Sequence, residues 1–386
     1  MAETPPACQR ERMATDAVAL TRDLVRFDTI NPPGAEAACA QQVARLLETA
    51  GFELGTYDLA PGRTSLVARI GGRPDAPPLC FTGHLDTVPL GEQPWTHDPH
   101  AAELAGGRLY GRGSTDMKSG LAAFVTAAIE LAPHLARTAG LVLVITAGEE
   151  TGCDGARYLV GLPGVLGRAG AIVVAEPTGN EPLLGHKGAL WLQARTSGVT
   201  AHGSMPERGV NAISKAARAV TRLEQFTFDV PPHPVLGGAT LNVGTIAGGL
   251  NVNSVPDAAT IGIDIRTIPG QPHTAVLRRL GDYLGQEVTL APFVDIEGIW
   301  TEPDDPWVQE VFDIATPVLG ERPVGRAAPY VTDVSLLAPA YGHPPSIVLG
   351  PGELALIHQT DEYCLVERIE QAVALYVGIA QRWCHC

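Results

Sequence analysis

The sequence predicts an α/β fold: a mixed-sheet domain with helices on both faces, interrupted by an inserted ferredoxin-like α+β domain. Short apolar runs alternate with amphipathic stretches in the first half of the chain. This alternation is typical of strands buried on both faces and of the helices that cover them. The middle of the chain changes to a different order of strands and helices. The length of 386 residues also suits two domains, or one large domain that carries an insertion.

The first part of the chain supplies most of the main sheet. Amphipathic helices are predicted at residues 17–27 and 38–50, and an Ala-rich helix at 119–131 that Pro133 ends. Strands are predicted from four short runs rich in β-branched and other apolar residues: 66–70, 79–82, 141–146 and 171–175. Together these elements predict an α/β domain with a parallel or mixed sheet.

The middle of the chain follows the order strand, helix, strand, strand, helix, strand. The six predicted elements span residues 189–196, 210–224, 240–246, 260–266, 274–284 and 287–290. This order is the split motif of a ferredoxin-like unit, which is compact enough to be an insertion.

Helices and a buried strand like those of the first part of the chain are predicted again near its end, at residues 307–315, 346–349 and 366–382. We therefore expect them to rejoin the first sheet. The predicted domains are residues 13–185 and 294–386 for the main domain and residues 186–293 for the insertion.

Composition argues against several classes of protein. Lys and Arg number 27 against 42 Asp and Glu, a net charge of −15, and such a field repels nucleic acid and anionic membranes. No apolar run approaches the roughly 18 residues that cross a bilayer. Seven cysteines without paired spacing, and an amino terminus without an apolar signal region, favour a cytoplasmic location. The residues before Met13 are predicted to form a disordered leader.

Carboxylates and a histidine follow three of the predicted strands. His84 and Asp86 follow one strand, Glu149 and Glu150 follow another, and Glu176 follows a third. Because the carboxyl ends of strands in an open α/β sheet are where ligands bind, these side chains are expected to lie close together. A solvated turn is the alternative for His84 and Asp86. For Glu149 and Glu150 it is less convincing, because adjacent carboxylates repel one another unless a cation or a shared proton offsets their charge.

Asp116 and His358 complete the candidate set. Asp116 lies where the glycine-rich turn GRGSTDMK leads into a helix, a position that an N-cap aspartate would also occupy. His358 lies in IHQTDEY, before the last helix. Two histidines, the four carboxylates that follow strands and Asp116 form the inventory of a two-metal site. Oxygen and imidazole ligands without cysteine suit zinc, cobalt or manganese.

A resemblance to a known family is carried by eight motifs in this order: HLDTVP, GRGSTDMK, AGEETG, AEPT, GHKG, TAHGSMPERGVNAI, DIRTIPG and GPG…IHQTDEY. From Met13 onward, the chain resembles the co-catalytic zinc aminoacylase/carboxypeptidase family, which includes acetylornithine deacetylase, succinyl-diaminopimelate desuccinylase and glutamate carboxypeptidase. The motifs GHKG, DIRTIPG and HQTDEY look most like acetylornithine deacetylase. The segment from Tyr330 to Asp333 departs from it, because acetylornithine deacetylases tend to have a Glu-containing segment there.

The resemblance implies a ligand set for two divalent metal ions per subunit, normally zinc with cobalt or manganese as substitutes. His84, Asp116 and Glu176 would bind one ion. Asp116, Glu150 and His358 would bind the other, so that Asp116 bridges the two ions. The family also has a cis peptide bond after the bridging aspartate.

Further roles are implied by the same resemblance. Glu149 would act as the general base, and Asp86 would fix the ring of His84. From the insertion, His202 would stabilise the oxyanion, Arg266 would hold the substrate α-carboxylate, and Asn253 would lie near the substrate. The alternatives are a turn histidine for His202, a surface ion pair for Arg266 and a turn asparagine for Asn253.

The implied activity is cleavage of the N-acyl amide bond of an N-acyl-amino acid by a metal-activated water, as in acetylornithine deacetylase. A dipeptidase, a carboxypeptidase or a succinyl-diaminopimelate desuccinylase on the same di-metal site is the main alternative. A metal-dependent binding or scaffold protein without turnover is the third. The resemblance further implies that the insertion serves as a lid and pairs two chains into a homodimer. The expected partner is thus a small N-acyl-amino acid or a short peptide.

Overall fold

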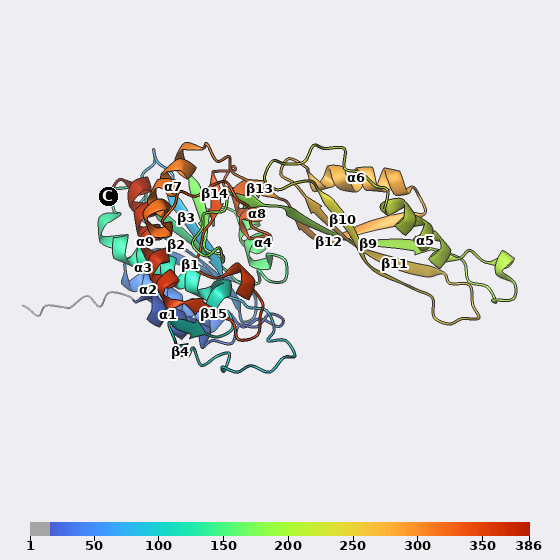
Figure 1. The fold of residues 1–386 in the computed structure, drawn as a ribbon, viewed down its shortest axis with the longest axis horizontal. Helices are drawn as coiled ribbons and strands as arrows, with labels where there is room; N and C mark the ends of the chain where they lie inside the picture. The colour runs from blue at the N-terminus through green and yellow to red at the C-terminus, as the bar shows by residue number, and fades with distance from the viewer. Residues whose placement is uncertain (1–15) are drawn as a thin grey trace, which may run out of the picture.

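The computed structural model describes residues 16–386 (Figure 1), so the predicted leader before Met13 lies outside the described residues. The main sheet has six strands in the order β1-β2-β6-β3-β7-β14. Their bounds are Glu53–Ala60, Arg63–Ile70, Leu141–Thr146, Leu79–His84, Ala171–Val174 and Ser346–Val348, in that order. Strands β6, β3, β7 and β14 run parallel, whereas β1 and β2 pair antiparallel. The predicted α/β class with a mixed sheet is confirmed.

Helices cover both faces of this sheet. One core packs the sheet against α1 (Ala17–Val25), α2 (Ala37–Thr49), α3 (Ser119–Leu131), α7 (Pro306–Leu319) and α9 (Val366–Cys384). The other core packs it against α4 (Asp154–Val160) and α8 (Val334–Ala340). Strand β6 shows the alternation that a strand between two cores requires, because Leu143 and Ile145 join the first core and Val142 and Val144 the second.

Strand β1 was not predicted from the sequence. Its side chains alternate between exposed and half-buried, because it forms the edge of the sheet and pairs only with β2. Such a strand contains too few buried apolar residues to give the continuous run that marked the other strands.

Residues 188–296 form a separate sheet of four antiparallel strands, which we call the four-stranded unit. Its strands are β9 (Gly188–Ser197), β10 (Thr240–Gly248), β11 (Ala258–Thr267) and β12 (Val288–Ile296), in the order β10-β11-β9-β12. Helices α5 (Ala212–Leu223) and α6 (His273–Leu284) share one core with this sheet. The order is the one that a ferredoxin-like β-α-β-β-α-β unit adopts. Strand β12 continues a little beyond residue 293, where the insertion was predicted to end.

The four-stranded unit projects to one side of the main domain in Figure 1. Two short strands pair where the chain leaves the main domain and returns to it: β8 (Gly185–His186) and β13 (Ile299–Trp300). A further small sheet consists of β4 (Leu104–Ala105), β5 (Arg108–Tyr110) and β15 (Tyr363–Leu365). Across residues 16–386, no helix combines the length and the apolar character that crossing a bilayer requires.

Candidate metal centre

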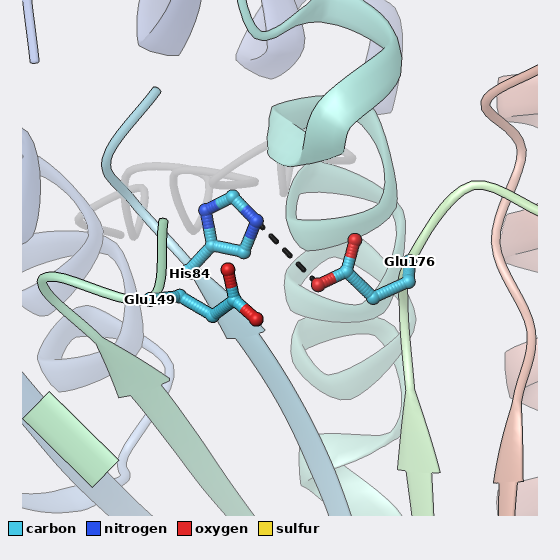
Figure 2. Close-up of side chains that lie close together, drawn as sticks. All are labelled: His84, Glu149 and Glu176. Atoms are coloured by element: carbon cyan, nitrogen blue, oxygen red, sulfur yellow. Dashed lines mark ion pairs between the residues drawn. The ribbon is translucent and has the colours of Figure 1, made fainter. Parts of the chain in front are cut away.

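The carboxyl ends of three parallel strands bring charged side chains together. His84 is the last residue of β3, Glu149 and Glu150 follow β6, and Glu176 follows β7. Figure 2 shows His84, Glu149 and Glu176 pointing toward one another. One potential ligand atom from each of these three lies within 4.8 Å of the others. The His84 Nε2 atom is 3.5 Å from Glu176 Oε1.

Asp116 lies between the two predicted metal-binding histidines. Its Oδ1 atom is 3.3 Å from His84 Nε2, and its Oδ2 atom is 3.3 Å from His358 Nε2. The same His358 nitrogen is 3.2 Å from Glu150 Oε2. All five residues predicted to bind metal therefore lie in one cluster, with the carboxylate of Asp116 at its centre.

A buried ion pair holds the loop that carries Asp116. The Glu362 carboxylate accepts hydrogen bonds from the backbone N–H groups of Gly113, Thr115 and Asp116, and Arg112 Nη1 lies 2.6 Å from Glu362 Oε2. Both side chains are buried. A cis peptide bond follows Asp116, as the resemblance implies. The sequence analysis did not single out Arg112 or Glu362, although Glu362 lies within the motif IHQTDEY.

Asp86 orders two parts of the cluster. Its carboxylate accepts hydrogen bonds from the backbone N–H groups of Glu149, at 3.0 Å, and Glu150, at 3.2 Å. Asn31, which the sequence analysis did not consider, donates to the same carboxylate at 2.9 Å. The His84 Nδ1 atom is 2.9 Å from the backbone oxygen of Asp86 and 3.6 Å from its Oδ1. Asp86 thus lies beside His84 as predicted, but its nearest contact to the ring is through the backbone.

The cluster has the chemistry of a site for divalent cations. Burial raises the pKa of Glu176 well above its ordinary range, and the charge of Asp116 adds to this effect. The Glu150 Oε1 atom is buried without a hydrogen-bond partner. Two histidines and four carboxylates in so small a space repel or remain unpaired unless cations bind among them. The donor set therefore fits metal ions.

The same carboxylates raise the pKa of both histidines. Burial lowers the pKa of His84, but the Glu176 and Asp116 carboxylates outweigh it and hold this pKa well above its ordinary value. Hydrogen bonds with Asp116 and Glu150 raise the pKa of His358 to about 10. The surrounding negative charge thus favours a cation at each ring, whether a proton or a metal ion.

Two further groups, Cys153 and Asp333, lie close to Glu149, and the sequence analysis gave neither of them a role. Cys153 Sγ donates to Glu149 Oε1 over 3.8 Å, and the three groups of Glu149, Cys153 and Asp333 approach within 4.8 Å of one another. Asp333 accepts a hydrogen bond from Thr146. Burial raises the pKa of Asp333 to about 6 and that of Glu149 well above its usual range. Asp333 belongs to the segment that departs from the acetylornithine deacetylase pattern.

The three residues predicted from the insertion separate into two places. Arg266 lies near the end of β11 and lines a cavity of about 460 Å³ together with Asp116, Glu149, Glu150 and Glu176. His202 and Asn253 lie at the other end of the four-stranded unit, where Gly203 N–H donates to the Asn253 carbonyl at 2.7 Å. His202 is exposed, and its Nδ1 atom is 2.8 Å from Ser204 Oγ. Within one chain, the structure therefore brings Arg266 to the cluster but not His202 or Asn253.

Carboxylates and imidazoles gather at one edge of the α/β sheet, a donor set that fits divalent metal ions. The sequence profile of peptidase family M20/M25/M40 matches residues 80–382. The chain belongs to this family and is an enzyme.

Curated relatives match nearly the whole chain. Acetylornithine deacetylase from Proteus mirabilis is 31% identical, and the alignment covers 95% of this chain and 96% of the relative. Succinyl-diaminopimelate desuccinylase from Cereibacter sphaeroides is also 31% identical, with 95% and 98% covered.

Solved structures share the fold at lower identity. A metallo-carboxypeptidase of this family from Sulfolobus solfataricus superposes with a TM-score of 0.74 at 17% identity, covering 95% of this chain and 99% of that one. A dinuclear metal-binding peptidase from Bacillus subtilis gives a TM-score of 0.70 at 18% identity, with 95% and 97% covered.

Proposed function

We propose that this enzyme cleaves the N-acyl amide bond of an N-acyl-amino acid, as the name of its relative acetylornithine deacetylase describes. One observation carries the proposal: a cavity in which Arg266, a cation suited to a carboxylate, faces the cluster of Asp116, Glu149, Glu150 and Glu176. Desuccinylation of succinyl-diaminopimelate and hydrolysis of dipeptides or of peptides from the carboxyl end are the alternatives on the same site.

Two divalent ions are proposed as cofactors, and zinc is the proposed metal because oxygen and imidazole ligands suit it. His84, Asp116 and Glu176 would hold one ion, and Asp116, Glu150 and His358 the other. When bound, the ions lower the pKa of a water molecule toward neutrality and polarise the substrate carbonyl.

Glu149 is proposed to move the proton. Its carboxylate takes a proton from the attacking water as the new C–O bond forms, and returns it to the amine nitrogen as the C–N bond breaks. The products are a free amino acid and a carboxylic acid. Asp86 positions Glu149 through the hydrogen bond to its backbone.

Residues of the four-stranded unit are proposed to bind the substrate. Arg266 pairs with the α-carboxylate, and Asn253 lies near the substrate. His202 donates a hydrogen bond to the oxyanion, an interaction worth about 3 to 4 kcal/mol for a single well-placed donor. Since His202 and Asn253 lie far along β9 and β11 from Arg266 in their own chain, we propose that they serve the site of a partner chain.

The insertion, residues 186–293, is accordingly proposed as a lid and as the interface of a homodimer. Closure would bend the chain near Gly185 and after β12. A hinge at Pro292 itself is less suitable, because Pro292 lies inside β12 and pairs with Leu192. We also propose a cytoplasmic location, because the six cysteines in residues 16–386 are free and five of them are buried.

A substrate panel tests the proposed activity. Metal-loaded protein is assayed with N-acetyl-, N-succinyl- and N-formyl-amino acids and with dipeptides, with zinc or cobalt added. Hydrolysis of N-acetyl-amino acids above the other classes is expected. A preference for dipeptides or for N-succinyl substrates would replace the proposal by one of its alternatives.

Mixed dimers test the placement of His202. The inactive variants Glu149→Ala and His202→Ala are dissociated, mixed and reassociated. Because the subunit with intact Glu149 would receive intact His202 from the other chain, random pairing is expected to restore about a quarter of wild-type activity. Verified mixed dimers without activity would mean that His202 does not act on the partner's site.

A further inference from the structure

The cavity beside the candidate metal centre has an apolar wall. Eight apolar or aromatic residues form it: Ala189, Trp191, Val294, Ile296, Pro329, Tyr330, Val331 and Ile357. Of these, Tyr330 directs its hydroxyl away, to the carbonyl of Pro177 at 2.7 Å. Arg266 is the lining residue that carries a full positive charge at any pH. The acidic lining residues, within the part of the chain that is described, all belong to the cluster of Asp116, Glu149, Glu150 and Glu176.

The open face of the four-stranded unit supplies one side of this wall. Arg266 pairs across the sheet with Ala189, which pairs in turn with Ile296. Residues directly opposite one another in antiparallel strands point to the same face, so these three side chains form one row. The next row on this face contains Asp264, Trp191 and Val294.

Arg266 and the apolar wall are close enough to contact one small molecule. The Arg266 guanidinium carbon lies 5.8 Å from the centre of the Trp191 ring. A substrate whose α-carboxylate pairs with Arg266 therefore has its α-carbon near Trp191, Ala189 and Ile296. The side chain on that carbon would meet hydrocarbon rather than a charged partner.

The acids on the neighbouring strands already have other partners. Asp264 pairs with Arg266 itself at 2.9 Å. Asp295 points to the other side of β12 and lies 2.6 Å from His273 Nδ1, and Glu297 accepts from the His273 N–H at 3.0 Å. Outside the metal cluster, the carboxylates described here near the apolar wall already have a partner, as Asp264 has in Arg266, so a substrate ammonium group would find no free carboxylate in this region.

We propose that the substrate of this enzyme carries an uncharged, apolar amino-acid side chain, in contrast to the ammonium-bearing side chains of ornithine and diaminopimelate. This inference rests on the proposed function and names the substrate class for the same site. Apolar side chains gain by leaving water for this wall. An ammonium group loses its hydration there without gaining a carboxylate.

A matched pair of substrates tests the inference. N-acetyl-L-norleucine and N-acetyl-L-ornithine have the same number of non-hydrogen atoms and differ by a terminal methyl against a terminal ammonium group. We expect kcat/KM at pH 7 to be at least about 100-fold higher for the norleucine compound, since an unpaired buried polar group discriminates strongly. Equal turnover of the two, or faster turnover of the ornithine compound, would overturn the inference.

Adding a carboxylate to the wall should reverse part of this preference. Val294→Asp is expected to lower kcat/KM for the norleucine compound and raise it for the ornithine compound, changing their ratio by at least about tenfold. Trp191→Glu, at a side chain that is 36% exposed, is a second variant in case Val294→Asp does not fold. Thr289→Asp adds the same charge on β12 outside the cavity and should leave the ratio unchanged. An unchanged ratio in folded Val294→Asp and Trp191→Glu would contradict the inference.

Binding separates this inference from the proposed function. The two compounds are titrated calorimetrically into metal-loaded Glu149→Gln protein. Tighter binding of the norleucine compound supports the apolar wall even if the wild-type enzyme hydrolyses neither compound, a result that would count against the proposed function alone. Binding of the ornithine compound as tightly as the norleucine compound would overturn the inference while leaving deacylation intact.

Discussion

The two sheets of this protein differ in how many of their faces are covered by helices and in where their polar side chains lie. Both faces of the six-stranded sheet are covered by helices, so its central strands β3, β6 and β7 are buried and charged groups gather where these strands end. Only one face of the four-stranded unit is covered, and polar and aromatic side chains such as Arg266 and Trp191 lie along the other. The first sheet therefore concentrates charge at one edge, whereas the second displays a surface. We expect substitutions at that edge to affect chemistry and substitutions on the open face to affect recognition.

The largest expected effect separates two adjacent residues at the charged edge. Glu149→Gln should retain the metal ions but lower kcat by about 10² to 10⁴, the contribution of a general base. Glu150→Gln should instead weaken the binding of one metal ion, because Glu150 lies beside His358. Metal content by elemental analysis and kcat are measured for both, with the exposed Glu48→Gln as the control. Equal metal loss in the two variants would refute this division of roles.

Asp116, the proposed bridging ligand, provides a second test of metal binding at the charged edge. Asp116→Ala removes the carboxylate that lies 3.3 Å from both histidines, so less than one tightly held metal ion per chain should remain. Elemental analysis after gel filtration measures this content. Two ions per chain in the variant would exclude Asp116 as the bridge.

His186 lies at the junction between the two sheets and should make stability depend on pH. Burial lowers its pKa from 6.5 to about 4, and its ring contacts the Lys187 carbonyl and Thr332 Oγ1. Protonation therefore favours the unfolded chain. The contribution of neutral His186 is complete above pH 6.5 and is lost as the pH falls toward 4, by about 3 kcal/mol in total.

Urea unfolding of metal-free protein between pH 7 and pH 4 measures this loss. His186→Gln should be less sensitive to pH than the wild type over this interval. The exposed His134→Gln should follow the wild type. A pH dependence that is the same in all three proteins would contradict the assignment to His186.

Arg266 should affect recognition more than chemistry. Arg266→Ala is expected to raise KM by about 10- to 100-fold with a smaller change in kcat, because it removes a cation that pairs with substrate. Arg195→Ala, on the same sheet but away from the cavity, should change neither. An equal loss of kcat and kcat/KM in Arg266→Ala would show that the open face takes part in the chemical step.

The smallest effect concerns the stability of the four-stranded unit alone. The Asn211 side chain accepts a hydrogen bond from the Ser214 N–H at the start of α5, at 2.9 Å. Asn211→Ala should lower stability by about 1 kcal/mol. Hydrogen exchange should increase in α5 and its neighbouring strands, with Asp16→Ala at α1 as the matched change in the main domain. Equal exchange in both sheets for each variant would show that they unfold together.

The sequence predicted the fold best where burial is greatest. The wholly apolar runs of β3, β6 and β7 identified central strands, and the periodicity of α3 and α9 identified the helices that cover them. Strand β1 was not predicted, because an edge strand needs no continuous apolar run. The boundaries of residues 186–293 and the roles of the site residues remain predictions.

Position after a predicted strand singled out His84, Glu150 and Glu176, and the family resemblance implied the ligand roles of these three and of Asp116 and His358. The groups that hold these residues in place could not be predicted from the sequence. Glu362 accepts hydrogen bonds from three backbone N–H groups of the loop around Asp116, and a contact to backbone does not depend on the side chain of its partner. Asp333 is separated from Thr146 by 187 positions, a distance that local patterns do not bridge.

The pairing of β8 with β13 has a consequence for the modularity of the chain. His186 lies opposite Ile299 and Gly185 opposite Trp300, so the strands that lead into and out of the four-stranded unit are separated by about 5 Å. A turn of two or three residues could join them. The unit could therefore be cut out and replaced by a hairpin without pulling apart the six-stranded sheet, and a different compact unit could be grafted at the same two positions.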